Sequence, residues 1–438
     1  MTATFRHIVN GALPAVTPNA IWGEVVSVEN GLLEVAGLNQ VAKIGDRLKF
    51  IDAQSSYGEI VAMRERSVFV LPDASMAGMA PGDRAYLCTD NEFRPSVEWL
   101  GHVINAAGEA IGAKVTPRGD RIMPLNAREK AMTNRRGLGA RLNTGLAPFD
   151  TFLPLCKGQR VGLFAGSGVG KTTLVGDLAK GIEADVVIVA LIGERSREIG
   201  EFVDNILASK GRNRSIVFVS TCDEPAPLKR RCALMAVAAA EYFRDMGLHV
   251  LVLFDSITRF ADAHREIALT AGETPSLRAY PPSTFRAIAA LAERTGPGAG
   301  SAGDITAIFS VLVAGSDMDE PIADTVRSIL DGHVVMDRAI AERGRFPSIN
   351  IRRSVSRSLP GAANGAENEL LTQARRVIAA YDDAATMIQT GLYAAGSDPL
   401  IDEAIKLWPA LEDFISEKSD SCAESYEKLE AALKPAAG

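Results

Sequence analysis

The sequence contains no hydrophobic run long enough to cross a membrane. Its longest apolar stretches, "VVIVALI" from Val186 and "ALMAVAAA" from Ala233, fall far short of the roughly 20 residues that a membrane-spanning helix requires. The first residues, "MTATFRHIVNGALPAVTP", are broken by charged and polar residues and by Pro14, so they lack the apolar centre of a signal peptide. We therefore expect no export of the chain, and another component would have to hold it at a membrane.

Cysteine is also scarce, and the chain has no excess of positive charge. The five cysteines are widely spaced, and no two form the C-x-x-C pair typical of zinc sites and redox dithiols. Such cysteines are typical of small buried residues in a reducing compartment. The 47 Lys and Arg are outnumbered by 54 Asp and Glu, and the net charge of −7 gives no overall attraction to nucleic acid or to an anionic membrane. Nucleic acid is therefore not an expected partner.

The sequence pattern changes twice along the chain. At 438 residues the chain exceeds what one hydrophobic core usually supports. Short alternating runs such as "EVVSV" and "LLEVA" predict an N-terminal β-barrel domain over residues 1–92. Longer apolar runs between helix-length segments predict an α/β domain with a parallel sheet over 93–359. Apolar residues at helical spacing, with Pro399 and Pro409 as breaks, predict a helical domain over 360–438.

The stretch "AGSGVGKTT" from Ala165 predicts a phosphate-binding loop between an apolar strand and a helix. Backbone N–H groups of such a turn hold a phosphate, Lys171 reaches its β and γ oxygens, and the Thr172 hydroxyl ligates Mg²⁺. Ala165 stands where the usual signature has glycine, at a point where strand becomes loop and only a small residue is needed. The expected nucleotide-binding residues are Gly166, Ser167, Gly168, Val169, Gly170, Lys171, Thr172 and Thr173.

Two acidic residues follow later apolar strands. Asp255 ends "HVLVLFD", where an acid would hold the Mg²⁺ water shell at the carboxyl edge of a parallel sheet. Glu194 follows "VVIVALIG" and could polarise the water that attacks the γ-phosphate. Taken singly, Asp255 could instead cap the next helix, and Glu194 could belong to a solvated charge cluster. The order of the three segments along the chain favours the catalytic interpretation.

The ordered segments "GSGVGKTT", "GERSRE", "LVLFDSITRF", "AYPPSTF", "FPSIN" and "SVSR" resemble the catalytic subunits of rotary ATP synthases and their type III secretion relatives. "DTFLPLCKGQRVGLFAGSGVGKTTL" and "GSDPLIDEAIKLWPALEDF" resemble the flagellum-specific export ATPases more closely, and these enzymes commonly carry alanine at the position of Ala165. The resemblance covers nearly the whole chain. It implies a RecA-like P-loop ATPase core flanked by a small β-barrel and C-terminal helices.

The resemblance also implies roles for individual residues. Lys171, Glu194 and Asp255 would be catalytic, with Thr172 and Asp255 at the Mg²⁺ ion. Arg195 would support Glu194 or the phosphates. Phe346 of "FPSIN" would pack on adenine, and Arg357 of "SVSR" would enter a neighbouring subunit's site as an arginine finger. Without the resemblance, Phe346 could be a core residue, and Arg357 could belong to a basic surface with its arginine neighbours.

The function implied is Mg²⁺-dependent ATP hydrolysis that drives flagellar type III protein export. The partners implied are further copies of the chain in a homohexamer, a stator-like regulator at the N-terminal region, the membrane proteins of the export gate, export chaperones and flagellar subunits. The implied location is cytoplasmic, at the periphery of the inner-membrane export apparatus.

Four alternatives remain open at this point. A virulence injectisome ATPase differs from the flagellar enzyme in only a few segments. A rotary synthase catalytic subunit would carry "GERTREGND" and an acidic "DELSEED"-like stretch, whereas this chain reads "GERSREIGE" and lacks the second. Glu194 argues against a non-catalytic nucleotide-binding ring subunit. A Rho-like RNA translocase should carry basic and aromatic residues near its N-terminus, and few are present here.

Overall fold

The computed structural model describes residues 20–29, 31–51, 56–74, 78–88, 92–126, 134–207, 212–313 and 317–434. The chain divides into two compact units. The first combines the described part of Met1–Glu92 with Glu224–Leu228 and Ala263–Pro281, and the second comprises the described residues of the remainder. The N-terminal segment, in which we expected no signal peptide and to which the resemblance assigns a regulator contact, lies outside the described residues. The domain boundaries set after residues 92 and 359 stay predictions.

The first unit contains a closed barrel in the strand order β1-β2-β5-β4-β3-β6. All its pairings are antiparallel. Alternate side chains, among them Val25, Leu33, Val35 and Val70, are buried inside, as the period-two pattern requires. This confirms the predicted barrel. Its strands are Trp22–Glu29 (β1), Leu32–Ala36 (β2), Arg47–Phe50 (β3), Tyr57–Met63 (β4), Ser67–Pro72 (β5) and Arg84–Leu87 (β6).

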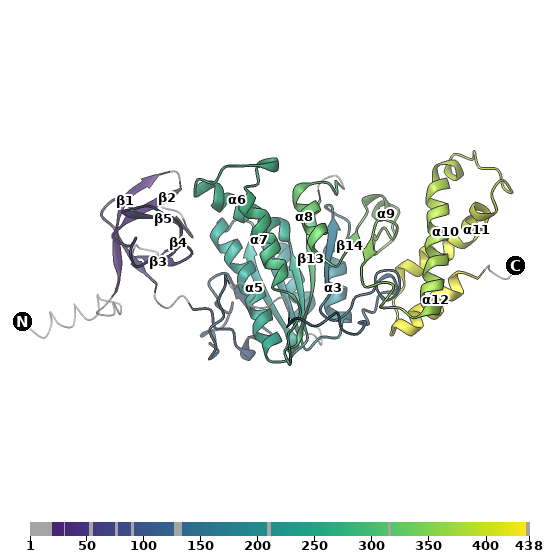
Figure 1. Ribbon diagram of the computed structural model, residues 1–438, viewed down its shortest axis with the longest axis horizontal. Helices are drawn as coiled ribbons and strands as arrows, with labels where there is room; N and C mark the ends of the chain where they lie inside the picture. The colour runs from purple at the N-terminus through teal and green to yellow at the C-terminus, as the bar shows by residue number, and fades with distance from the viewer. Residues whose placement is uncertain are drawn as a thin grey trace, which may run out of the picture. The chain divides into compact units, whose positions relative to one another are not determined.

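The second unit is built on a nine-stranded sheet with the main order β15-β14-β8-β13-β11-β9-β10-β7 (Figure 1). The pairings from β14 to β7 are parallel, while β15 and β12 pair antiparallel at β14 and β13. The predicted parallel α/β core is confirmed. The strands are Val103–Asn105 (β7), Arg160–Ala165 (β8), Val186–Glu194 (β9), Ser215–Thr221 (β10), Val250–Asp255 (β11), Gly296–Pro297 (β12), Asp304–Leu312 (β13), Gly332–Val335 (β14) and Val355–Ser356 (β15).

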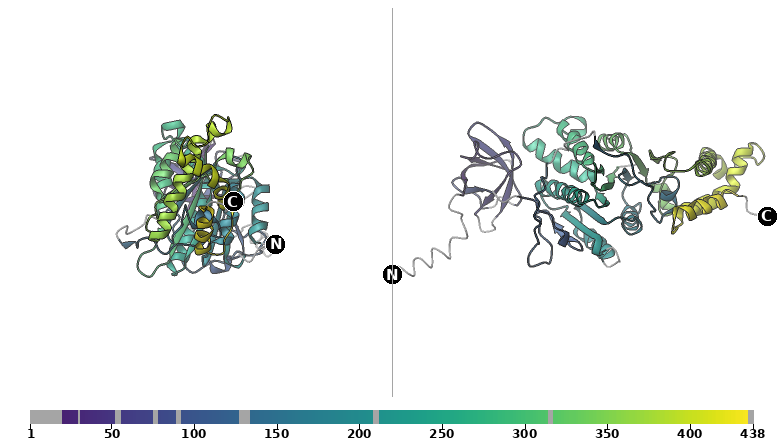
Figure 2. Two further views of the ribbon diagram at one scale, coloured as in Figure 1. Left: turned by 90° about the vertical axis from the view of Figure 1, so that its right-hand side faces the viewer. Right: turned by 60° about the horizontal axis from the view of Figure 1, so that its bottom comes forward.

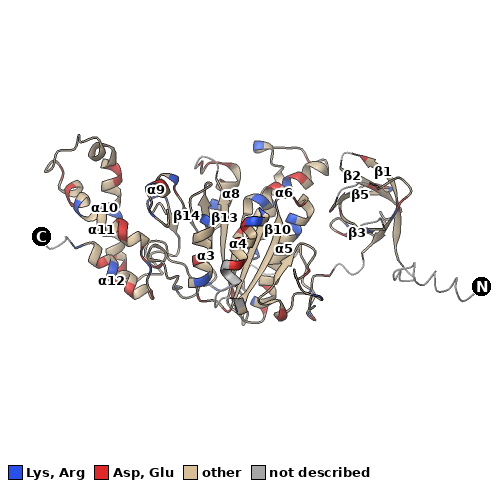
Figure 3. Ribbon diagram, turned by 180° about the vertical axis from the view of Figure 1, so that it is seen from behind, with Lys and Arg blue, Asp and Glu red and all other residues tan. Residues whose placement is uncertain are grey.

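Helices connect the parallel strands and cover both faces of this sheet, because each parallel connection must cross back over a face. Figure 1 views the sheet from the side of α7 and α8, and Figure 3 from the side of α3 and α4. Among the described residues, none of the helices has the length and hydrophobicity needed to cross a bilayer. The helices are Ala147–Asp150 (α2), Lys171–Gly181 (α3), Ser196–Leu207 (α4), Ala226–Asp245 (α5), Ile257–Thr270 (α6), Pro282–Glu293 (α7), Pro321–Ile329 (α8) and Arg338–Glu342 (α9).

The chain ends in three helices, Gly365–Gln389 (α10), Pro399–Ser416 (α11) and Cys422–Ala432 (α12), of which α10 packs beside α11 and α11 beside α12 (Figure 2). The predicted helical segment is confirmed, and Pro399 lies in the first turn of α11, where a proline costs no hydrogen bond. The predicted break at Pro409 is wrong, because α11 continues through it. The buried side chains on either side, Leu407 and Leu411, outweigh the lost helical hydrogen bond.

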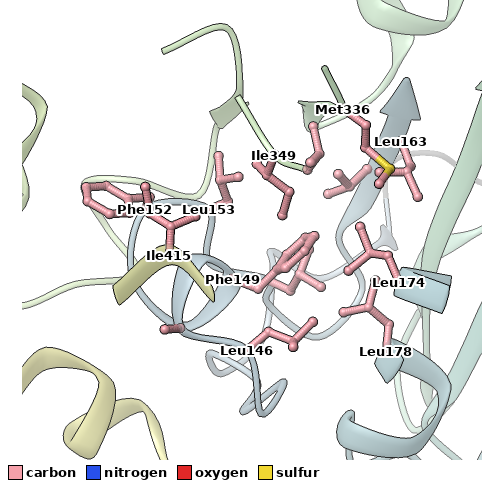
Figure 4. Close-up of a cluster of buried hydrophobic side chains, with 14 of the residues drawn as sticks. Leu146, Phe149, Phe152, Leu153, Leu163, Leu174, Leu178, Met336, Ile349 and Ile415 are labelled. Carbon is pink, nitrogen blue, oxygen red and sulfur yellow. The ribbon is translucent and has the colours of Figure 1, made fainter. Parts of the chain in front are cut away.

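One buried hydrophobic cluster joins these helices to the nucleotide-binding sheet (Figure 4). Leu163 of β8 and Leu174 of α3 lie at one end of it, Phe149 of α2 lies between, and Ile415 of α11 lies at the other. Each such fully buried side chain contributes about 1.5–3 kcal/mol to stability. Movement of the terminal helices therefore involves side chains that pack next to the phosphate-loop helix.

Glu367 stabilises the start of α10 through an ion pair and a helix cap. Its carboxylate accepts two hydrogen bonds from Arg141, each 3.0 Å long, and one from the backbone N–H of Asn364 at 2.8 Å. The Asn364 side chain accepts a hydrogen bond from the Glu367 N–H, which completes a capping box.

We expect Glu367→Ala to make backbone amides in the first turn of α10 exchange about tenfold faster with solvent, because the cap and the ion pair are lost together. Glu367→Gln keeps the capping geometry and should raise exchange by less. Hydrogen exchange read by mass spectrometry measures both, with Glu369→Ala on the exposed side of α10 as control. Unchanged exchange in Glu367→Ala would contradict the assignment.

Candidate active site

The segment from Ala165 to Lys171 forms a tight loop between β8 and α3. Ala165 is 1% exposed and pairs in register with Leu312 of β13, so it belongs to the strand and needs no glycine backbone. Gly168 and Gly170 have φ angles of +76° and +83°, which are left-handed values that favour glycine. A methyl group added at Gly168 would meet no described, non-neighbouring heavy atom within 4 Å. The described residues therefore leave open space beside the loop at Gly168.

Lys171 begins α3 and points across the loop to β11. Its Nζ donates a hydrogen bond to Oδ1 of Asp255, the last residue of β11, and the two side chains are only 12% and 7% exposed. Ser310 of β13 donates a second hydrogen bond to the same oxygen, at 2.6 Å. Strand order explains the meeting, because β13 lies between β8 and β11. The structure thus brings two predicted catalytic residues into direct contact.

Glu194 ends β9, the strand next to β11, and is half-buried. Burial raises the pKa of its carboxyl, and the negative charge of Asp255 raises the pKa further. The positive charges of Lys171 and Arg259 oppose this rise. These influences show that Glu194 shares one electrostatic environment with the Lys171 and Asp255 pair. A carboxylate with a raised pKa is a better proton acceptor near neutral pH than an ordinary one.

Phe346 lies against the end of the phosphate loop although it is distant in the sequence. A methyl group added at Gly170 would come within 3.2 Å of the Phe346 ring, which is 52% exposed. The hydroxyl of Ser348 donates to the Val169 carbonyl at 2.7 Å, and Arg345 donates to the Ile349 carbonyl at 2.8 Å. These contacts fix an exposed flat ring beside the loop, and they remove the alternative that Phe346 is a core residue.

Two predicted arginines form no hydrogen bond or ion pair with Lys171, Glu194 or Asp255 among the described residues. Arg195 is exposed, and its side chain pairs with Glu198 at 2.9 Å, one turn along α4. Arg357 is exposed and directly follows β15, and its backbone N–H donates to the backbone carbonyl of Asp331. The backbone N–H of Asp331 in turn donates to the carbonyl of Arg160, the first residue of β8. The phosphate loop leaves the other end of β8, roughly 17 Å along the strand. Within one chain, Arg357 therefore does not join the site.

The open loop and its polar side chains fit a nucleotide phosphate and a Mg²⁺ ion. Thr172 is exposed at the first turn of α3, and its hydroxyl has no hydrogen-bond partner among the described residues. Among all the residues that the structure describes, no three His, Cys, Asp or Glu side chains form a cluster that could hold a metal ion by themselves. Mg²⁺ commonly keeps several waters and binds through few protein oxygens plus phosphate, so the Thr172 hydroxyl as a ligand and Asp255 acting through the water shell would suffice.

Two residues at the site were not predicted from the sequence. Arg259, in the first turn of α6, lies with its side chain against Gly193 and is one of the charges acting on Glu194. It directly follows "DSIT", so its closeness to Asp255 in sequence was a usable signal. Ser310 lies within an apolar strand, and nothing in its neighbours indicates that it contacts Asp255.

Comparison with known proteins connects this geometry to a family. Residues 145–356 match the nucleotide-binding domain of the ATP synthase alpha/beta family, and residues 364–434 match the C-terminal domain of the EscN ATPase of type III secretion. The flagellum-specific ATP synthase of Caulobacter vibrioides is 43% identical over 95% of this chain and 97% of its own length. The chain belongs to the type III export ATPase family. The predicted P-loop ATPase activity is thereby confirmed.

Solved structures of this export ATPase family have the same fold. The assembled ATPase EscN from the type III secretion system of enteropathogenic Escherichia coli superposes with a TM-score of 0.87, at 33% identity, over 94% of this chain and 100% of that one. EscN in complex with its central stalk EscO superposes with a TM-score of 0.84 over the same shares, again at 33% identity. These matches confirm the predicted order of barrel, RecA-like core and C-terminal helices. They favour ATP-driven type III export over the rotary synthase and RNA translocase alternatives.

Proposed function

We propose that this export ATPase hydrolyses ATP at the cluster of Lys171, Glu194 and Asp255 and uses the energy for flagellar type III protein export. The contact of Lys171 with Asp255 beneath an open glycine-rich loop, with Glu194 in the same electrostatic environment, is the observation that carries the proposal. It combines a phosphate-binding cation, a metal-binding acid and a proton acceptor in one place, which is what ATP hydrolysis requires.

The chemistry follows from these side chains. Backbone N–H groups from Gly166 to Gly170 hold the β-phosphate, and Lys171 leaves Asp255 to bind the β and γ oxygens. A Mg²⁺ ion held by Thr172 and Asp255 would neutralise charge that develops on the phosphate oxygens. Glu194 orients the attacking water and accepts its proton. The exposed ring of Phe346 packs on adenine, where a flat π surface discriminates weakly between bases.

A ring of identical chains completes the site. Arg357 lies too far from its own phosphate loop to reach it, and its planar guanidinium suits the charge on a γ-phosphoryl group in a transition state. A neighbouring copy placed head to tail would bring Arg357 to the open side of the loop. The solved relative is an assembled ATPase, which supports a ring, and we propose a homohexamer. Arg195, exposed at the start of α4, remains the proposed support for Glu194 or the phosphates.

The partners and the location follow from the same family membership. The complex of EscN with its central stalk EscO supports a stalk-like partner for the C-terminal helices. Asp and Glu outnumber Lys and Arg along each of α10, α11 and α12 (Figure 3). We propose that the ring works in the cytoplasm at the periphery of the inner membrane, with the export gate, chaperones, flagellar subunits and an N-terminal stator-like regulator.

The flagellar assignment is preferred over the virulence injectisome. The flagellum-specific relative from Caulobacter vibrioides is 43% identical to this chain, whereas the type 3 secretion system ATPase of Xanthomonas euvesicatoria is 37% identical, a value that lies within the range of the other flagellar relatives. Because both systems use the same ATPase chemistry, the site does not distinguish them. An experiment in the cell is therefore needed to decide between flagellar and virulence export.

Replacing Lys171 with alanine should abolish flagellar filaments and motility, because the β and γ phosphates lose their cation. Complementation of a strain that lacks the chromosomal copy, scored by filament staining and swimming, measures the effect. Lys114→Ala, an exposed lysine beyond the edge strand β7, is the matched control. Normal filaments with lost virulence secretion would favour the injectisome, and normal export of both kinds would reject the proposal.

A further inference from the structure

A single buried hydroxyl faces Asp255 from the neighbouring strand. Phe254 of β11 pairs in register with Phe309 of β13, so Asp255 and Ser310 follow at the same level of the sheet. Ser310 and Asp255 are both buried. The Ser310 hydroxyl donates to Asp255 Oδ1 at 2.6 Å, which is short for a hydroxyl donor and typical of a charged acceptor.

The two oxygens of Asp255 have different environments. Oδ1 accepts hydrogen bonds from both Ser310 and Lys171. No described residue donates to Oδ2, which is left as the oxygen that can face a metal-bound water. The two oxygens of a carboxylate are equivalent, so the donors to one of them fix the direction and plane of the whole group, and with it the direction of the other oxygen.

Only one of the two donors can stay when nucleotide binds. Lys171 begins the phosphate-loop helix, and on the function proposed above it moves to the phosphate oxygens. Ser310 is fixed in the middle of the sheet between β8 and β11, so it remains at Asp255.

We infer that Ser310 is a positioning residue that holds Oδ1 of Asp255, so that Oδ2 stays directed at the Mg²⁺ water shell after Lys171 has moved to the phosphates. This inference rests on the proposed ATPase site. It assigns to β13 a specific part in metal-dependent nucleotide binding that the phosphate loop and Glu194 do not supply.

A purely structural role would look different. Thr306 of the same strand provides the comparison, since it is equally buried and bonds to the His249 ring at 2.9 Å and to the Gly158 N–H at 3.0 Å. Neither partner belongs to the active site. Losing the Thr306 hydroxyl should lower thermal stability without changing the response to Mg²⁺, whereas losing the Ser310 hydroxyl should change that response.

The test measures equilibrium binding of a fluorescent ADP to the full-length protein, once with excess Mg²⁺ and once with EDTA. In Ser310→Ala, the gain in affinity from Mg²⁺ should fall by about tenfold, the size expected for one lost hydrogen bond to a charged group. Affinity in EDTA should stay within about twofold, because the phosphate loop is intact. Ser310→Thr, which keeps the hydroxyl, should restore the gain.

Two further variants keep the inference falsifiable. Ser310→Cys preserves nearly the same volume but is a weak donor, so it should lose the Mg²⁺ gain even if the alanine variant folds poorly. Thr306→Ala should lower the melting temperature but keep the gain in ADP affinity from Mg²⁺. If both Ser310→Ala and Ser310→Cys show the same gain in ADP affinity from Mg²⁺ as the wild type, this inference is overturned and the proposed site is not. A wild-type protein without any Mg²⁺ gain overturns the proposed site itself.

Discussion

Replacing Glu194 with glutamine will leave ATP binding close to the wild-type level and lower kcat by about 10²–10⁴-fold, the range for loss of a general base. Glutamine keeps the shape of the side chain at the end of β9 but does not accept a proton. It also removes the negative charge beside Asp255, so affinity for nucleotide should not weaken. Single-turnover hydrolysis together with equilibrium binding separates the two effects.

Glu201→Gln provides the matched control for Glu194. Glu201 is exposed on α4 and pairs with Arg197 at 2.9 Å, so its variant should keep near-normal turnover. The pH profile adds a second readout. Because the pKa of Glu194 is raised, wild-type kcat should rise with pH as this carboxyl ionises, and Glu194→Gln should lack that rise. Near-normal turnover in Glu194→Gln would refute its assigned role.

Mixing two inactive variants should restore activity if Arg357 acts on a neighbouring subunit. Arg357→Ala alone is expected to lower kcat by about 10³–10⁵-fold, the effect of losing an arginine finger. In rings assembled from equal amounts of Arg357→Ala and Lys171→Ala chains, about a quarter of the interfaces combine an intact loop with an intact finger. ATPase activity of the mixed rings should therefore recover to about that fraction of the wild-type value.

The control and the contradicting result are both defined for this experiment. Arg352 is exposed in the same cluster and pairs with Asp383 at 2.6 Å, so Arg352→Ala removes a nearby positive charge and should leave turnover near normal. Ring formation is verified by light scattering before activity is measured. No recovery in well-formed mixed rings would count against a role for Arg357 in a neighbouring site.

Local patterns in the sequence were sufficient for the phosphate loop. "AGSGVGKTT" requires glycine at two left-handed positions and places Lys171 and Thr172 at a helix start, and both features depend only on adjacent residues. Asp255 and Glu194 were also identifiable, because each follows an apolar strand of a parallel sheet. The barrel and the terminal helices followed from periodicity in the same way.

Contacts between distant segments were decided by the tertiary structure. Strand order places β13 between β8 and β11, and this order, rather than any local pattern, brings Ser310 to Asp255. Phe346 reaches Gly170 for the same reason, while Arg195 turns instead to Glu198. Pro409 shows the opposite balance, because burial of its neighbours overrides the local preference to end the helix.

The sequence by itself therefore determined which residues can bind phosphate, because that chemistry is carried by backbone conformation and neighbouring side chains. Only the tertiary structure decided how the Asp255 carboxylate is oriented and that Arg357 lies at the far end of β8 from its own loop. The physical reason is that register and strand order arise from packing over the whole sheet, and no short stretch of the chain encodes them.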